Sequence, residues 1–230
     1  MKRLLFSILF ILSISLIANA QESGAYLKLG VNFANVSTTS DGGVEDANIL
    51  TSFHVGFMGD VPVGKFFSFQ PGLYFTGKGS KLQSGNPTDA TYYRATSNPY
   101  YIEIPVNAVI KLPLGPASSA FFVGAGPYVA MGIAGKNKVD GKLLGVSYSS
   151  KENIEFSNDD PTTMNEEENT GMGIMKRFDY GLNATAGFQL NRGVISINYG
   201  YGLAKLQSGS NNSDNNNKHR VLSLTVGFKL

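Results

Sequence analysis

Two histidines are the side chains of this chain best suited by type to exchange protons near neutral pH, because an imidazole titrates close to about pH 6.5. A hydrolase built on one of them would need a nucleophile and an acidic residue within mutual reach. His54 lies in the middle of a segment that alternates like a strand, where packing is the simplest role. His219 follows Ser208, Ser210 and Ser213, but these serines belong to an asparagine-rich stretch that is typical of a loop. The sequence therefore predicts structural roles for both histidines, no catalytic residue and no enzyme.

Two further motifs have the residue types of a ligand site without its spacing. Gly72-x4-Gly77-Lys78 is similar to the start of a phosphate-binding loop, but Gly79 stands where Ser or Thr is needed and no helix is expected to follow. The segment 136–175 carries eight carboxylates and four lysines without the spacing of a calcium-binding loop. A solvated acidic loop is the prediction there, with a divalent-ion site as the alternative. The chain has no cysteine, and the sequence predicts no metal and no cofactor.

The first twenty residues are expected to be a cleaved secretory signal. Lys2 and Arg3 precede an apolar run over 4–17, and Ala18-Asn19-Ala20 is a small-x-small cleavage site. Export through the Sec pathway with cleavage after Ala20 leaves residues 21–230 as one domain. The signal holds two of the nineteen basic residues and none of the seventeen acidic ones, so the mature charge is zero. A neutral chain without a basic patch argues against nucleic acid as a partner.

The segment 100–112, YYIEIPVNAVIKL, sets the pattern for the rest of the chain. Its residues alternate between an apolar set and a mostly polar set, which predicts a β-strand with one face of each kind. Thirteen residues suit a tilted strand that crosses a bilayer, which needs about 9–11. Eight segments share the alternation: 24–36, 51–61, 65–78, 100–112, 119–133, 176–191, 193–206 and 218–230.

The connections between these segments alternate between long and short along the chain. In an up-and-down barrel, alternate connections lie at the same end, so all long loops gather at one rim and all tight turns at the other. The predicted fold is all-β, an eight-stranded antiparallel up-and-down transmembrane β-barrel in the outer membrane. Its termini and turns are expected in the periplasm, its long loops outside and its apolar side chains against lipid.

The polar sets must then fill the lumen, because eight strands leave room for little more than side chains. The polar or charged residues expected to face inward are Lys28, Asp60, Glu103, Asn107, Lys111, Asp179 and Lys229. Buried charges need partners, and we expect Lys28 and Asp60 to pair. Pro71, Pro105 and Pro127 fall inside three consecutive strands, where proline cannot donate to the ladder. We expect three bulges there, with a weakened seam in the wall as the alternative.

The run Tyr101, Ile102, Glu103, Ile104, Pro105, followed by a short turn and a glycine-rich strand, resembles the PorT-like outer-membrane β-barrel family. The resemblance extends over essentially the whole chain. It implies an eight-stranded barrel in a Gram-negative outer membrane, and some members of the family are linked to protein secretion. It implies no catalytic residue. Phe228 and Leu230 have the spacing of a C-terminal signal for outer-membrane assembly, although an aromatic residue is usual at the last position.

The functional prediction is a non-enzymatic integral outer-membrane protein with loops for binding or for a role in an envelope or secretion complex. Expected partners are outer-membrane lipid and lipopolysaccharide, the barrel-assembly machinery and an envelope protein. A narrow porin-like channel for small solutes is one alternative, disfavoured by the filled lumen. A lipid-modifying enzyme of the outer membrane is the other, disfavoured because no convincing catalytic triad is present.

Overall fold

The computed structural model describes residues 24–37, 49–115, 119–157, 174–206 and 217–230. The predicted signal peptide and Ser208, Ser210 and Ser213 lie outside these ranges. In the described part of the chain, no helix is long and apolar enough to cross a membrane. The strands formed by the described residues are β1 (Gly24–Ser37), β2 (Leu50–Pro62), β3 (Phe67–Gly77), β4 (Ser80–Ser84), β5 (Tyr92–Pro113), β6 (Ala120–Leu143), β7 (Val146–Asn153), β8 (Glu155–Phe156), β9 (Ile174–Met175), β10 (Phe178–Leu190), β11 (Gly193–Gly202) and β12 (Lys218–Lys229).

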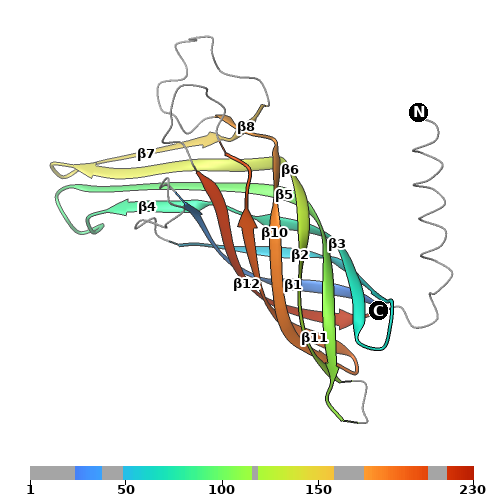
Figure 1. Ribbon diagram of the computed structural model, residues 1–230. Coiled ribbons are helices and arrows are strands. Elements are labelled where there is room, and N and C mark those ends of the chain that lie inside the picture. Colours follow the sequence, from blue (N-terminus) through green and yellow to red (C-terminus); the bar gives the residue numbers. More distant parts are fainter. Residues whose placement is uncertain (1–23, 38–48, 116–118, 158–173, 207–216) are drawn as a thin grey trace, which may run out of the picture.

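Eight of these strands close into a ring in the order β1, β2, β3, β5, β6, β10, β11, β12 (Figure 1). Every pair in the ring is antiparallel, and the first and last strands close it with Leu29 opposite Val226. The predicted eight-stranded antiparallel barrel is therefore confirmed. We call the end with the short β2–β3, β5–β6 and β10–β11 connections the turn end, and the opposite end the loop end.

The wall is apolar on its outer side and polar on its inner side. Phe57 and Val129 point outward and are 57% and 58% exposed, whereas Asn32 and Thr225 point inward and are 0% and 3% exposed. Alternation along a strand sends successive side chains to opposite faces. The inversion relative to a soluble barrel is the arrangement that lipid contact requires.

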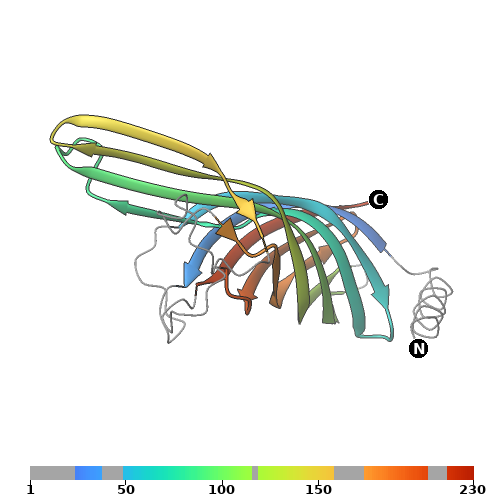
Figure 2. The same cartoon turned by 90° about the horizontal axis from the view of Figure 1, so that it is seen from above.

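A four-stranded sheet extends β5 and β6 beyond the ring. These strands contain 22 and 24 residues, and β4 and β7 pair with their outer parts. Figures 1 and 2 both show this sheet projecting from the loop end. A two-residue turn, Leu144 and Gly145, joins β6 to β7 with positive φ angles of 49° and 86°. We call the four strands beyond the ring the projecting sheet.

The projecting sheet corrects two sequence predictions. Residues 79–97 and the first part of 136–175 were expected to be loops, but much of each is strand. The physical reason is that each of these polar segments gains a neighbouring strand, and ladder hydrogen bonds then stabilise it despite weak local preference.

The three prolines interrupt the strand ladder without shifting its register. Across Pro71, β2 and β3 keep one register, with Met58 opposite Gly72 and Val61 opposite Phe69. The pairs on either side of Pro105 and of Pro127 likewise keep one register. The predicted bulges at the prolines are wrong. The irregularity lies instead at Tyr100 and Tyr101, where the β5–β6 register shifts.

Candidate functional sites of the lumen, the rim and the projecting sheet

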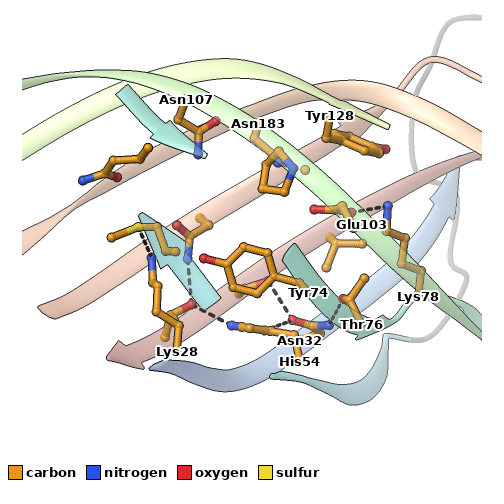
Figure 3. Close-up of a pocket in the computed structure, with 18 residues that line it drawn as sticks. Lys28, Asn32, His54, Tyr74, Thr76, Lys78, Glu103, Asn107, Tyr128 and Asn183 are labelled. Carbon is orange, nitrogen blue, oxygen red and sulfur yellow. Dashed lines mark hydrogen bonds and ion pairs between the residues drawn. The ribbon is translucent and has the colours of Figure 1, made fainter. Parts of the chain in front are cut away.

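A buried ion cluster occupies the loop end of the lumen. Lys78 Nζ lies 2.6 Å from Glu103 Oε2 and 2.9 Å from Asp179 Oδ2 (the former drawn in Figure 3). The Tyr128 hydroxyl donates to the same Asp179 oxygen at 3.1 Å, and the ammonium lies 4.1 Å from the centre of the Tyr128 ring. The Lys78 ammonium thus contacts two carboxylates and the face of the Tyr128 ring, and it is buried from solvent.

His219 points into the lumen beside this cluster. It is 1% exposed, and its Nε2 lies 3.2 Å from the Tyr101 hydroxyl. The two rings pack edge to face with 5.4 Å between their centres. The partner of this imidazole is therefore a phenol. A phenol hydrogen-bonded to histidine is an ordinary packing arrangement for a lumen and does not make a serine nucleophile.

A second charged cluster lies at the turn end. Asp60 forms an ion pair with Lys111 through Oδ2 and accepts from Gln70 Nε2 at 3.5 Å through Oδ1. Lys28 points into the same region, but its ammonium contacts the Met58 sulfur at 3.6 Å. Among the described residues, no carboxylate lies within ion-pair distance of Lys28. The predicted Lys28–Asp60 pair is therefore wrong, because Lys111 reaches Asp60 from β5 across the neighbouring strand.

The six lumen charges balance as a whole but not within each cluster. The turn-end cluster has two cations, Lys28 and Lys111, for the one carboxylate of Asp60. The loop-end cluster has one cation, Lys78, for two carboxylates. Opposite excess charges therefore lie at the two ends of the lumen, which leaves the described interior neutral overall.

A network of neutral polar groups lies between Lys28 and the Lys78–Glu103 pair (Figure 3). Asn32 Oδ1 lies 2.6 Å from His54 Nδ1 and accepts from Ser223 Oγ at 2.8 Å. Since an amide oxygen only accepts, Nδ1 of His54 carries the proton, and Nε2 is free to accept from the Thr225 hydroxyl at 3.0 Å. The Asn32 amide nitrogen donates to Thr76 Oγ1 at 2.9 Å. His54 is thus a lumen-packing residue, as its place in the sequence suggested.

Apolar clusters close the lumen at both ends. The turn-end plug consists of Tyr26, Met58, Val109, Phe122 and Val194. The loop-end plug consists of Val36, Tyr101, Tyr128, Ala130, Ile154, Phe156, Met175 and Leu206. Phe156 of β8 folds back over the mouth, and Gly132 leaves room for its ring, since a Cβ there would overlap the aromatic carbons.

Between the two plugs lies a polar cavity of about 80 Å³, lined by residues that include Lys28, Asn107 and Glu103. That volume holds a few water molecules, since each needs roughly 10–15 Å³ by this measure. Asn107 Oδ1 is buried without a protein partner and faces this space. Among the described residues, the turn-end plug and the loop-end plug lie on either side of this cavity.

Six of the seven polar or charged residues that the sequence predicts in the lumen lie there. Lys28, Asp60 and Asp179 are buried in the lumen, and Glu103, Asn107 and Lys111 are partly buried along it. Lys229 differs, because it lies at the last turn-end position of β12 and its side chain is exposed. Tyr101, Ile104 and Pro105 of the family-like motif share β5 with Glu103, and Ile104 faces outward, 48% exposed.

Lys78 is the functional residue that sequence reasoning missed. It lies just beyond β3, on the same parity as the inward Thr76, so strict alternation identifies it. In the sequence it stands out only as the last residue of a motif similar to a phosphate-binding loop. Asn32 and Tyr128 were also missed as network members, because an inward position does not reveal which groups across a lumen will meet.

A groove of about 520 Å³ lies on the outer surface at the loop-end rim of β10, β11 and β12. Its lining combines three lysines with apolar side chains of the lipid-facing wall: Lys176, Lys205, Lys218, Phe178, Tyr180, Leu203 and Ala204. Lys176 is fixed by its backbone N–H, which donates to the Leu206 carbonyl at 2.8 Å. We call this the rim groove.

The projecting sheet has two faces of different charge. Residues directly opposite each other across an antiparallel ladder share a face, so the registers of β4–β7 sort the side chains. One face carries six cations and one carboxylate: Lys81, Arg94, Lys136, Lys138, Lys142, Lys151 and Asp140. The single charge on the other face is Glu152. We call the former the basic face.

Asp140 is the one carboxylate of the basic face, and its own neighbours hold it ionised. Lys138 Nζ lies 2.8 Å from its Oδ2, and the Ser149 hydroxyl donates to Oδ1 at 2.8 Å. These two hydrogen bonds lower the pKa of the Asp140 carboxyl below its ordinary value. The remaining five cations of this face form no ion pair with a described carboxylate.

An eight-stranded ring with an apolar outer wall, a polar sealed interior and its long connections at one end defines a membrane β-barrel of the outer-membrane type. Residues 19–208 match the family described as outer membrane protein beta-barrel domain, and the chain belongs to that family. A search by sequence among curated proteins found no match.

Several solved outer-membrane barrels are similar in structure at low identity. Ail, the attachment invasion locus protein of Yersinia pestis, solved with the heparin analogue sucrose octasulfate, is 14% identical with a TM-score of 0.40, over 91% of this chain and 100% of that one. Neisserial surface protein A is 13% identical with a TM-score of 0.41, over 91% and 100%. The N-terminal β-barrel domain of Pseudomonas aeruginosa OprF is 10% identical with a TM-score of 0.30, over 89% and 97%.

Proposed function

We propose that this protein is a non-enzymatic outer-membrane barrel that uses its projecting sheet to bind polyanionic molecules outside the cell. In this proposal the chain is exported with cleavage after Ala20, the turn end faces the periplasm and the loop end faces outward. The finer resemblance to PorT-like barrels, carried by Tyr101, Glu103, Ile104 and Pro105, is part of the same proposal.

The main support for the proposal is the excess positive charge of the basic face. Five of its six cations have no carboxylate partner among the described residues, and they are spread over four adjacent strands. Ladder hydrogen bonds hold these strands in register, so the spacing between cations is fixed before a ligand arrives. A preformed array of cations attracts a polymer with repeated negative charges and pays little ordering cost on binding.

The lumen supports a binding role over transport. The turn-end and loop-end plugs leave a cavity of only about 80 Å³ between them. Five of the six charged side chains of the lumen form ion pairs with one another, as Lys78 does with Glu103 and Asp179. These features favour a barrel whose wall is a platform for the projecting sheet.

The test is binding of dextran sulfate and neutral dextran to the full chain in phosphatidylcholine nanodiscs. Lys136→Gln, Lys138→Gln and Lys151→Gln together remove three cations of the basic face, and Lys65→Gln, Arg192→Gln and Lys229→Gln remove three elsewhere as the matched control. We expect the first variant to weaken dextran sulfate binding and to flatten its salt dependence, while the control binds like the wild type.

Two results would overturn the proposal. Equal affinity for neutral dextran and dextran sulfate would show that charge is not what the sheet recognises. Equal losses in the basic-face variant and the matched control would show that the charge of the whole protein, rather than this face, attracts the polymer.

A further inference from the structure

We propose that the rim groove is a binding site for a lipid with a phosphate-bearing headgroup, in the leaflet that surrounds the loop end. Lys176, Lys205 and Lys218 would contact the phosphate, and an acyl chain would lie along Tyr180 and Leu203. The site is separate from the basic face of the projecting sheet. The inference depends on the proposed function in one respect, which is the side of the membrane that the loop end faces.

The three lysines come from three different segments that meet at this rim. Lys176 precedes β10, Lys205 follows β11 and Lys218 begins β12. Among the described residues, none of the three has a carboxylate within ion-pair distance. Three ammonium groups lining one groove repel each other, and an anion that contacts all of them removes that repulsion.

The apolar part of the groove identifies the ligand as a lipid rather than a free anion. Phe178 and Tyr180 are 55% and 54% exposed, and they belong to the outward set that forms the lipid-facing wall. Leu203 lies beside them, held by a hydrogen bond of 2.9 Å from its N–H to the Tyr180 carbonyl. A soluble phosphate would leave this apolar surface unused, whereas a lipid fills both parts of the groove.

The position of the groove on the wall matches the depth at which headgroups lie. Its lysines are at the loop-end limit of the strands. Phe178 and Tyr180 lie two and four residues beyond Lys176 along the chain, progressively deeper in the wall. Aromatic side chains prefer the level of the headgroups, and lysines extend beyond it toward water. Phosphate and acyl chain would therefore meet their partners at the same time.

The experiment is native mass spectrometry of the full chain in a non-ionic detergent with added lipid A, either bearing both phosphates or dephosphorylated. Lys176→Gln, Lys205→Gln and Lys218→Gln form the test variant, and Lys65→Gln, Arg192→Gln and Lys229→Gln form the matched control. Each lysine near an anionic headgroup contributes about fivefold in affinity, so the test variant should bind phosphorylated lipid A on the order of 100-fold more weakly. The control and the dephosphorylated lipid report on general charge and on the acyl chains alone.

A second variant guards against a folding defect in the first. Tyr180→Ser keeps all three lysines and removes part of the apolar wall of the groove. It should therefore weaken lipid A binding, and it should bind inorganic phosphate no more tightly than the wild type does. Inorganic phosphate added as a competitor separates the two sources of the anion. Full displacement of lipid A by phosphate would mean a free-anion site and would overturn the lipid proposal.

Unchanged lipid A binding in the lysine variant, or equal binding of the two forms of lipid A, would also overturn it. Dextran sulfate binding measured on the same variants keeps the two proposals apart. A wild type that binds dextran sulfate but does not distinguish the two forms of lipid A counts against the rim groove alone. Loss of dextran sulfate binding in the basic-face variant leaves the rim groove untouched.

Discussion

Lys78 and Asp179 are 101 residues apart in the chain, yet Nζ and Oδ2 lie 2.9 Å apart at the loop end of the lumen. Their side chains are 4% and 1% exposed, so the pair has almost no help from solvent. Glu103 contacts the same ammonium from β5. A single lysine therefore joins β10, β5 and the end of β3 across the lumen.

Replacement of Lys78 by methionine should destabilise the barrel strongly. The substitution keeps the length of the side chain but leaves Glu103 and Asp179 buried beside each other without a cation. Removing one partner of a buried ion pair costs about 3–5 kcal/mol. Urea unfolding in lipid vesicles, followed by the change in electrophoretic migration between folded and unfolded barrel, measures it.

The control for Lys78 is Lys81→Met on the basic face, which should change stability by less than about 0.5 kcal/mol. Adding Glu103→Gln and Asp179→Asn to Lys78→Met should restore part of the lost stability, since the carboxylate charges are then removed as well. If the triple variant is less stable than Lys78→Met, the cost does not come from unpaired charge.

The two turn-end lysines should respond differently to the same substitution. Lys111→Met leaves Asp60 with only the long contact from Gln70 and should cost about 3–5 kcal/mol. Lys28→Met replaces a buried ammonium that contacts a thioether, so its cost should stay within about 1 kcal/mol. The same urea titrations measure both. A larger loss for Lys28→Met than for Lys111→Met would show that Lys28 is the true partner of Asp60.

The pairing of Asp60 marks the limit of prediction from this sequence. Alternation places Lys28, Asp60 and Lys111 on the inward face correctly, because the period of a strand is local. It does not choose between two inward lysines. Which of them reaches Asp60 depends on strand tilt and on the distance across the lumen, and neither is written in the local pattern.

The projecting sheet was missed for a different reason. Residues 134–143 of β6 include three lysines and two glycines, a composition that reads as loop. Strand formation there depends on β5 and β7 on either side, since ladder hydrogen bonds outweigh weak strand preference. The ring itself was predictable, because lipid contact imposes a strong apolar alternation that the projecting sheet does not need.

The row of prolines predicts a line of faster amide exchange across the wall. The register is kept at Pro71, Pro105 and Pro127, but residues beside each of these prolines have no partner in one of the strand ladders. Amides next to these interruptions should exchange faster than those at the same depth between β1 and β12, where the register is continuous from Tyr26 to Ser37. Hydrogen exchange by NMR on the folded barrel measures it, and uniform protection across both regions would show that the wall has no weak line.

Asp140 predicts a pH dependence confined to the projecting sheet. Because the pKa of its carboxyl is lowered on folding, it stabilises the sheet above its ordinary value of 3.8 and ceases to do so as the pH falls through the lowered pKa. The pair is exposed, so the effect is about 0.2–1 kcal/mol. Exchange of β6 and β7 amides, corrected for intrinsic rates, should rise between pH 5 and about pH 3. Asp140→Asn should remove that rise, and Glu152→Gln on the opposite face should keep it.

The two plugs predict how conductance depends on substitution. In planar bilayers the wild type should show no steady conductance, because apolar clusters close the lumen at both ends. Ile154→Ala with Phe156→Ala opens the loop end only, and Tyr26→Ala with Phe122→Ala opens the turn end only. Two closures in series must both be removed before ions pass, so each pair alone should leave the barrel closed.

The quadruple variant should conduct, provided that the loss of four large side chains leaves the barrel folded. Each substitution of this size in a core costs about 2–5 kcal/mol, so folding is checked first by electrophoretic migration. Val109→Ala with Val194→Ala, a smaller reduction within the turn-end plug, is combined with Ile154→Ala and Phe156→Ala as the control for general loosening and should stay closed. Conductance after opening one end alone would show that the other plug does not seal the lumen, and conductance of the wild type would support the narrow channel over the binding platform.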